Sequence, residues 1–68
     1  MERKQYLDLC QQQAVKGDKF VTCNGISYQP LAYQLGFHSD STVRHTAVLV
    51  ESETNTVLYC RLEDVKEK

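Results

Sequence analysis

The sequence predicts an α+β fold in which one N-terminal helix packs on a bent four-stranded antiparallel sheet. Apolar side chains recur about every 3.6 residues up to Gly17, which is typical of a helix, and about every 2 residues beyond it, which is typical of strands. The chain has 68 residues, enough for one domain with a small core. We therefore expect a single domain over residues 1–68, with a helix at 2–16 and strands at about 19–23, 26–37, 43–51 and 56–62.

The N-terminal segment, residues 2–16, is predicted to form an amphipathic helix. When the residues are projected at about 100° each, five apolar side chains fall within an arc of about 160°. These side chains are Tyr6, Leu7, Leu9, Cys10 and Ala14. Gly17 follows the last turn, and glycine readily takes the left-handed backbone conformation that ends many helices. We expect the helix to stop there and to bury one face.

Two local signals shape the first half of the predicted sheet. The pair Asn24-Gly25 predicts a tight hairpin turn, because a type I′ turn requires positive φ at both central residues. In the next strand the apolar alternation shifts phase near Pro30, which cannot donate a hydrogen bond to a neighbouring strand, so we expect a bulge or a bend. Residues 38–42 are predicted to form a polar turn, and the tail 63–68 one helical turn.

The two C-terminal strands carry apolar side chains on both faces. If the loop between them has an even number of residues, the two residue numbers of every facing pair add up to the same value. Leu49 then shares a face with Leu58, and Ala47 shares it with Cys60. The opposite face then holds Val48, Val50, Val57 and Tyr59. A sheet with one face in water normally alternates apolar with polar residues. Both faces of this hairpin therefore need cover.

Two explanations account for the second apolar face. Either the sheet closes into a small SH3-like or OB-like barrel, or another molecule covers the face, as in a homodimer or a partner complex. The predicted interaction surface comprises Val48, Val50, Val57 and Tyr59. The predicted core comprises Leu9, Cys10, Phe20, Ile26, Leu35, Leu49, Leu58, Cys60 and Leu62.

The charge composition shows no preference for an anionic partner. Eight Lys and Arg residues face nine Asp and Glu residues, for a net charge of −1, which excludes bulk attraction to nucleic acid or anionic lipid. No apolar run reaches the about 18 residues that a membrane-spanning helix needs, and the first residues do not have the pattern of a signal peptide. We expect a cytoplasmic protein with no membrane partner.

The three cysteines, Cys10, Cys23 and Cys60, are odd in number and form no Cys-x-x-Cys pair. We expect reduced thiols that pack as small apolar side chains. A single bond between Cys23 and Cys60 requires neighbouring strands and is disfavoured by cytoplasmic redox conditions. A zinc site made of both of them with His45 and His38 is the other alternative, but it contains no local ligand pair.

No pattern in the sequence indicates catalysis. The run His38-Ser39-Asp40-Ser41 contains the residue types of a hydrolase triad, but side chains adjacent in sequence cannot adopt the geometry of a triad. The glycines are isolated, so no glycine-rich phosphate loop is present. We expect a protein that is not an enzyme and that needs no metal or other cofactor.

Binding of single-stranded nucleic acid by a small β-barrel is the alternative function. Such a site uses tyrosines on which bases stack and basic side chains that contact phosphates. The candidates are Lys19, Tyr28, Tyr33, Arg44 and Arg61. They are dispersed among as many acidic residues, which makes nucleic acid the less favoured partner.

A strand, a polar turn, a second strand and an acidic turn follow one another in the segments 45–51 and 56–65, after the motif Asn24-Gly25-Ile26-x-Tyr28. This part of the chain resembles small uncharacterised proteins encoded by phages and prophages of Gram-positive bacteria. The resemblance implies an accessory protein that binds a host or phage component, and it assigns no site residue. We therefore expect a small binding or regulatory module that acts through a protein partner or through self-association.

Overall fold

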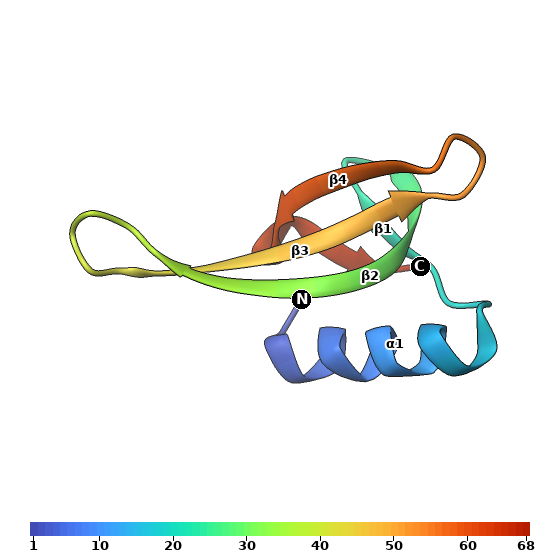
Figure 1. Cartoon of the computed structure of the whole chain (residues 1–68), viewed down its shortest axis with the longest axis horizontal. Coiled ribbons are helices and arrows are strands. Elements are labelled where there is room, and N and C mark those ends of the chain that lie inside the picture. The colour runs from blue at the N-terminus through green and yellow to red at the C-terminus, as the bar shows by residue number, and fades with distance from the viewer.

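The computed structural model describes all 68 residues and confirms an α+β architecture, with one helix packed on an antiparallel sheet (Figure 1). Its elements are α1 (Arg3–Lys16), β1 (Val21–Cys23), β2 (Ile26–Phe37), β3 (Val43–Glu51), β4 (Thr56–Arg61), the 3₁₀ turn η1 (Leu62–Asp64) and β5 (Val65–Glu67). The sheet has five strands in the order β4-β3-β2-β1-β5, one more than the sequence predicted. The tail does form a helical turn, η1, but it continues into β5, which pairs with β1.

Helix α1 ends where the sequence predicted. Gly17 has φ 74° and donates its backbone N–H to the carbonyl oxygen of Gln13 at 2.8 Å, which closes the last turn. The start of the chain is held differently, because the N-terminal ammonium of Met1 donates to the carbonyl oxygens of Leu62 and Val65, both at 3.0 Å. These bonds tie the beginning of α1 to η1 and to β5.

The first hairpin and the bend in β2 confirm the two local signals. Asn24 and Gly25 have φ of 55° and 79°, as a type I′ turn requires, and they join Cys23 to Ile26. The register of β2 against β3 shifts between Pro30 and Ala32, which is the expected bulge. Strand β2 therefore pairs with β1 at its beginning and with β3 along the rest of its length.

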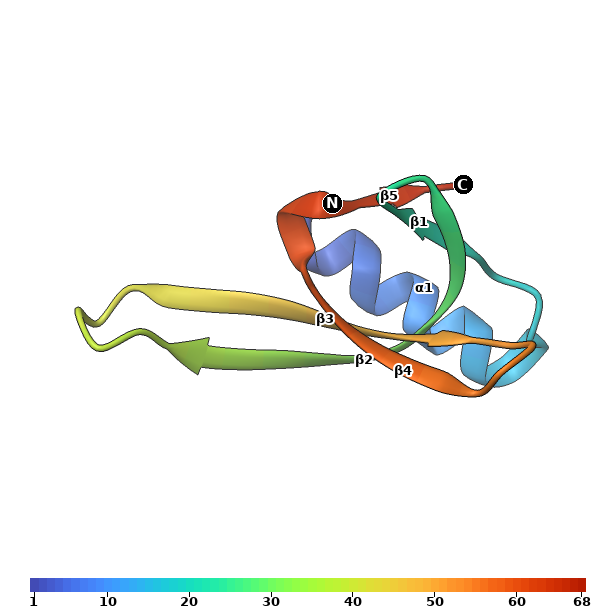
Figure 2. The ribbon, with the colours of Figure 1, turned by 90° about the horizontal axis from the view of Figure 1, so that it is seen from above.

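The sheet curls but does not close, so the expectation of an SH3-like or OB-like barrel is wrong for this chain. Strands β4 and β5 are the two edges of the sheet and do not pair with each other. The chain leaves β4 at Arg61 and passes through η1 to β5, which pairs with β1 on the side away from β2. Helix α1 lies beneath the curl in Figure 1 and spans the space between its two halves in Figure 2.

The β3–β4 hairpin has the predicted register. Leu49 pairs with Leu58 and Ala47 pairs with Cys60 on the face that points toward the core. Val48 pairs with Tyr59 and Val50 pairs with Val57 on the opposite face. The even-numbered loop was sufficient to predict these pairs, because the two residue numbers of every facing pair in such a hairpin add up to the same value.

The core has as many residues as predicted but a different membership, and it lies between the two halves of the curl and α1. It consists of Tyr6, Leu9, Val21, Cys23, Ala47, Leu49, Cys60, Leu62 and Val65. Four residues of the predicted core are confirmed, namely Leu9, Leu49, Cys60 and Leu62, while Cys10 and Leu58 pack partly buried against it. The predictions for Phe20, Ile26 and Leu35 are wrong, with exposures of 39%, 53% and 52%. Phe20 precedes β1, Ile26 follows the first turn, and Leu35 lies beyond the end of the covered sheet.

Cys23 and Cys60 form a disulfide that joins β1 to β4, so the expectation of three reduced thiols is wrong. These two strands are not neighbours in the sheet, and the bond crosses the core between its two halves. A bond across the core between non-adjacent strands cannot be inferred from strand pairing alone, so this arrangement was not predicted. Cys10 is the free thiol, and burial raises its pKa.

Helix α1 is neither long nor apolar enough to cross a membrane.

Candidate interaction site

The outer part of the β2–β3 hairpin, Tyr33–Thr46, extends away from the rest of the molecule (Figures 1 and 2) and is here called the arm. Outward from Thr46, which pairs with Arg61 of β4, its two strands pair only with each other. Strand β1 pairs with β2 at Ile26–Tyr28 alone, and the pairing of β4 with β3 ends at Arg61 opposite Thr46. Both edges of the arm are therefore free of a neighbouring strand.

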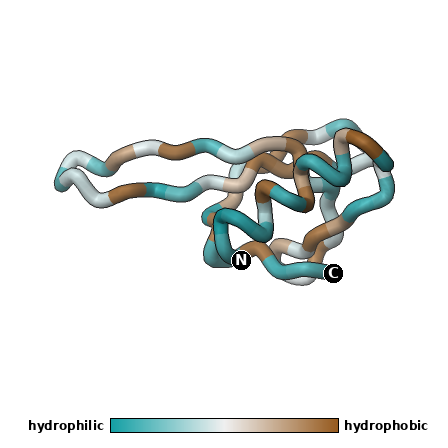
Figure 3. The backbone as a smooth tube through the Cα atoms, turned by 90° about the horizontal axis from the view of Figure 1, so that it is seen from below, coloured by the Kyte–Doolittle hydropathy of each residue, from teal (hydrophilic) through white to brown (hydrophobic).

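One face of the arm is apolar and open to solvent. The register places Leu35 beside His45 and Phe37 beside Val43, so these side chains share a face with Tyr33. Leu35, Phe37 and Val43 are 52%, 70% and 48% exposed. The hydropathy colouring in Figure 3 shows apolar positions alternating with polar ones along the arm. The other face carries Gln34, Gly36, Arg44 and Thr46.

The two ends of the apolar face differ in how their side chains are held in place. Near the body, the Tyr33 and His45 rings stack with centroids 5.9 Å apart, and the Tyr33 hydroxyl and His45 Nδ1 form a hydrogen bond. Phe37 and Val43 lie next to the tip and have no such partner among the polar groups of the arm. The most exposed apolar side chain of the arm, Phe37, is thus one that lies next to its tip.

The tip, residues 38–42, consists of a loop of three residues, 39–41, and the two residues that close it, His38 and Thr42. His38 donates its N–H to the carbonyl oxygen of Thr42 at 2.9 Å, and Ser41 donates its N–H to the carbonyl oxygen of His38 at 2.9 Å. The Asp40 carboxylate accepts hydrogen bonds from the hydroxyl and N–H of Thr42 at 2.7 and 3.2 Å. These bonds lower the pKa of Asp40. The Asp40 side chain therefore stabilises the turn through its hydrogen bonds to Thr42.

The predicted interaction surface is only partly accessible. Val48 is buried, at 6% exposure, with Ala32 and Tyr59 paired on either side of it, so its inclusion in that surface is corrected. Val50 is half-buried, and Val57 and Tyr59 are 46% and 61% exposed. The accessible remainder is a small patch on β4, whereas the arm, which the sequence argument did not identify, presents a longer apolar face.

The residues proposed for nucleic acid binding do not form one surface. Lys19 lies after α1, where its N–H donates to Gln13 Oε1 at 2.7 Å, and Tyr28 packs partly buried against the core. Tyr33 and Arg44 lie on opposite faces of the arm. Arg61 is bonded to acidic neighbours, with its Nε 3.1 Å from Asp64 Oδ2 and its Nη1 3.6 Å from Glu63 Oε1.

The structure does bring Arg44 and Arg61 to one groove of about 570 Å³ beside the arm. The groove is lined by the chain start, Met1–Arg3, by His38 and Val43–His45 of the hairpin, and by Arg61–Glu63. Arg3 is a third arginine of this groove. Arg3 was not predicted as a site residue, because nothing local in the sequence indicates that the start of α1 lies beside η1 and the arm.

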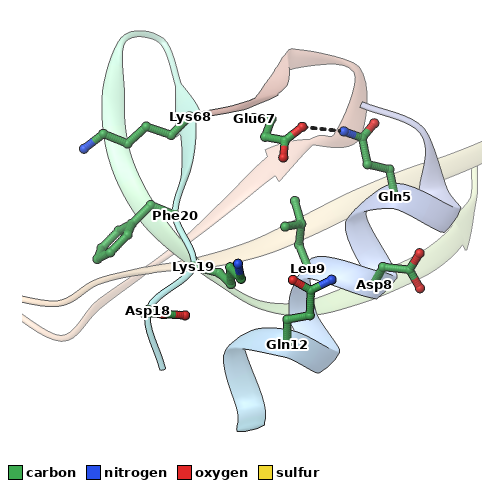
Figure 4. A pocket seen from close by; sticks show the side chains of 9 residues that line it. All are labelled: Gln5, Asp8, Leu9, Gln12, Asp18, Lys19, Phe20, Glu67 and Lys68. Carbon is green, nitrogen blue, oxygen red and sulfur yellow. Dashed lines mark hydrogen bonds between the residues drawn. The ribbon is translucent and has the colours of Figure 1, made fainter. Parts of the chain in front are cut away.

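A second concavity, of about 450 Å³, lies between α1, the segment before β1 and the C-terminus. Figure 4 shows its polar lining, in which Gln5 Nε2 donates to Glu67 Oε2 at 2.9 Å. The Lys68 ammonium lies 5.5 Å from the centre of the Phe20 ring, within the range of a cation–π contact. Its lining carries both acidic side chains, Asp8, Asp18 and Glu67, and basic ones, Lys19 and Lys68, so it presents no charge of a single sign.

The alternative zinc ligands do not come together. Cys23 and Cys60 bond to each other, His45 stacks on Tyr33, and His38 Nδ1 lies 3.1 Å from Arg44 Nη2. The structure contains no group of three or more His, Cys, Asp or Glu side chains arranged to hold a metal ion.

The core contains one perturbed titratable group, Tyr6. Burial is the main cause that raises the pKa of Tyr6, and Cys10 beside it raises the pKa further. The Tyr6 hydroxyl donates to the Val48 carbonyl oxygen at 2.9 Å.

No protein-family model, curated protein or solved structure matches this chain.

Proposed function

We propose that this protein is a small non-enzymatic binding module that acts through protein–protein interaction, and that the arm is its contact element. The observation that carries the proposal is the exposed apolar face formed by Leu35, Phe37 and Val43 on a hairpin that projects from the body. Contiguous apolar side chains in such a position are typical of interaction sites. The pattern-level resemblance to phage accessory proteins and the expected cytoplasmic location agree with this function.

The energetics of the arm favour a partner. Complete burial of a fully exposed large apolar side chain contributes about 1.5–3 kcal/mol, and these three side chains are about half exposed, so covering them contributes about 3–5 kcal/mol of the about 8 kcal/mol that a micromolar affinity requires. A two-stranded hairpin outside a larger sheet is only marginally stable in water. Contact with a partner protein or with a second copy therefore stabilises the arm as well as the complex.

The proposal is tested with serine substitutions that leave the body unchanged. Phe37→Ser and Leu35→Ser should abolish capture of partners at low salt and any self-association seen by sedimentation. Val15→Ser is the matched control, because Val15 is 79% exposed on α1, away from the arm. Equal behaviour of the Phe37 and Val15 variants would remove the arm from the proposal.

Nucleic acid binding remains the second candidate because Arg3, Arg44 and Arg61 line one groove. A site of that kind loses affinity steeply with salt, whereas an apolar contact does not. Titration with labelled single-stranded oligonucleotides at low salt should give binding that weakens on Arg44→Gln if this candidate is correct. A flat titration would eliminate it.

A further inference from the structure

The backbone of β3 in the arm has hydrogen-bonding groups with no strand to receive them. The bond from His38 N–H to Thr42 carbonyl oxygen fixes the alternation of the β2–β3 ladder. By this alternation Arg44 directs its N–H and C=O toward β2, and Val43 and His45 direct theirs to the opposite edge. Strand β4 occupies that edge only as far as Thr46. Figure 2 shows β4 turning away into η1 before the arm begins.

This free edge lies in the arginine-lined groove. Val43–His45 form one side of the groove, while Met1–Arg3 and Arg61–Glu63 close its inner end. An unpaired strand edge is a template for another strand, and proteins usually block it with a bulge, a proline or a covering loop. The covering is incomplete here: β4 ends opposite Thr46, η1 contacts β3 only beside that end, and the only bulge in the hairpin is at Pro30, so the edge is open at Val43 and at the N–H of His45.

The charges in the groove select the kind of strand that fits. Arginines at three positions face Glu2 and Glu63, and Glu63 is already paired with Arg61. The ammonium of Met1 is used by two carbonyl oxygens. Arg3 forms no ion pair, and the side chain of Arg44 contacts only His38 Nδ1. Positive charge is therefore left for a ligand.

We propose that an extended acidic segment of a partner protein binds this groove as an additional strand beside Val43–His45, in line with β4. The inference rests on the proposed function and specifies the partner's chemistry. Backbone bonds to Val43 and His45 would give affinity, and side chains on alternate faces would give specificity. On one face the segment meets Val43 beside His45, and on the other Arg44 and Arg61. The preferred sequence therefore alternates apolar with acidic residues.

The probe is a fluorescein-labelled, end-capped heptapeptide in which four valines alternate with three glutamates. We expect saturable binding by anisotropy, and we expect amide exchange at Val43 and His45 to slow about tenfold or more, since each outward N–H gains an acceptor. A matched peptide with lysine in place of glutamate should bind about tenfold more weakly or not at all, because the arginines repel it.

Two substitutions at one position separate the backbone contact from the side chain. His45→Pro removes an N–H that points outward, which a strand edge tolerates, whereas His45→Ala keeps it. Loss of one hydrogen bond corresponds to about a tenfold change in Kd, so His45→Pro should bind about tenfold more weakly than His45→Ala. If His45→Pro lacks a folded spectrum, the same comparison is made with Val43→Pro and Val43→Ala.

The outcomes that overturn the inference are distinct from those that overturn the proposed function. Equal binding by the proline and alanine variants, equal binding of the lysine peptide, or unchanged exchange at Val43 and His45 each refutes strand addition. Oligonucleotide binding that displaces the peptide and survives His45→Pro assigns the groove to nucleic acid and refutes it as well. A third outcome separates the two proposals. If Phe37→Ser abolishes partner capture and His45→Pro does not, the apolar arm is the contact element and strand addition is refuted.

Discussion

The inner and outer halves of β3 have the same pattern of alternation but opposite environments. Ala47 and Leu49 in the inner half are fully buried, whereas Val43 and His45, on the same face of the same strand, are exposed. The difference lies in what covers the face. Helix α1, β1 and the disulfide cover the inner half, and nothing covers the arm. Alternation thus identifies which side chains share a face, but it does not show where the cover ends.

Alanine substitutions at two leucines provide the strongest test of this comparison. Leu49→Ala should lower the unfolding free energy by about 2–5 kcal/mol, because it leaves a cavity in a fully covered site. Leu35→Ala should lower it by at most about 1 kcal/mol, because the side chain is already half in water. Urea unfolding of both variants measures the difference, and similar losses would show that the arm belongs to the core.

The disulfide is the second difference between body and arm. Cys23 and Cys60 are 37 residues apart, and a cross-link of that span stabilises by about 2–4 kcal/mol, chiefly by restricting the unfolded chain. Cys23→Ser or reduction should lower the unfolding free energy by that amount without changing the arm. Cys10→Ser is the control, because this residue is not part of the bond.

A thiol count of the folded protein tests the bond directly. Extraction in the presence of an alkylating agent should label Cys10 alone after unfolding without reductant, and all three cysteines after reduction. Labelling of all three cysteines without reductant would show that the bond is absent in the cell and would contradict the prediction.

Tyr6 makes the stability of the body depend on alkaline pH. Burial holds the pKa of its phenol far above the ordinary value, and its hydroxyl donates to Val48. Because the folded pKa exceeds the unfolded value of about 10, this contribution is complete below pH 10 and is lost as the pH rises further. The slope should reach about 1.4 kcal/mol per pH unit.

The control for the pH effect is Tyr6→Phe, measured by urea unfolding between about pH 9 and 11, where the slope assigned to tyrosine develops. This variant loses the hydrogen bond to Val48, at a cost of about 1 kcal/mol, but it also loses the alkaline slope. A slope that persists in Tyr6→Phe would mean that lysine deprotonation or another group causes it.

The parts of the fold that could be predicted from sequence depend on local signals. Gly17 and Asn24-Gly25 fixed the end of α1 and the first turn, and the bounds of β2 and β3 were predicted without error. The register of β3 and β4 followed from the length of their loop. In each case the signal lies within a few residues of the feature that it determines.

The parts that could not be predicted depend on tertiary placement. Strand β5 has only three residues and pairs with β1, which lies more than forty residues earlier in the chain. The disulfide requires the sheet to curl, and the groove requires Arg3 to lie beside η1. Alternation in the arm is the same as in a covered strand, so the sequence placed Leu35 in the core.

The smallest expected effect lies at the tip of the arm. Ser41 has φ 70°, a left-handed conformation that costs an L-residue about 1 kcal/mol and costs glycine little. Ser41→Gly should therefore stabilise the closed hairpin by somewhat less than about 1 kcal/mol, since glycine also loses more entropy on ordering. Because the arm is uncovered and can open locally, the gain should appear as slower amide exchange in Tyr33–Thr46 with little change in Tm. Ser39→Gly is the matched control, because Ser39 has no positive φ and glycine there only adds freedom to the open state. Faster exchange in Ser41→Gly, or an equal rise in Tm and arm protection, would show that the arm opens only when the body unfolds.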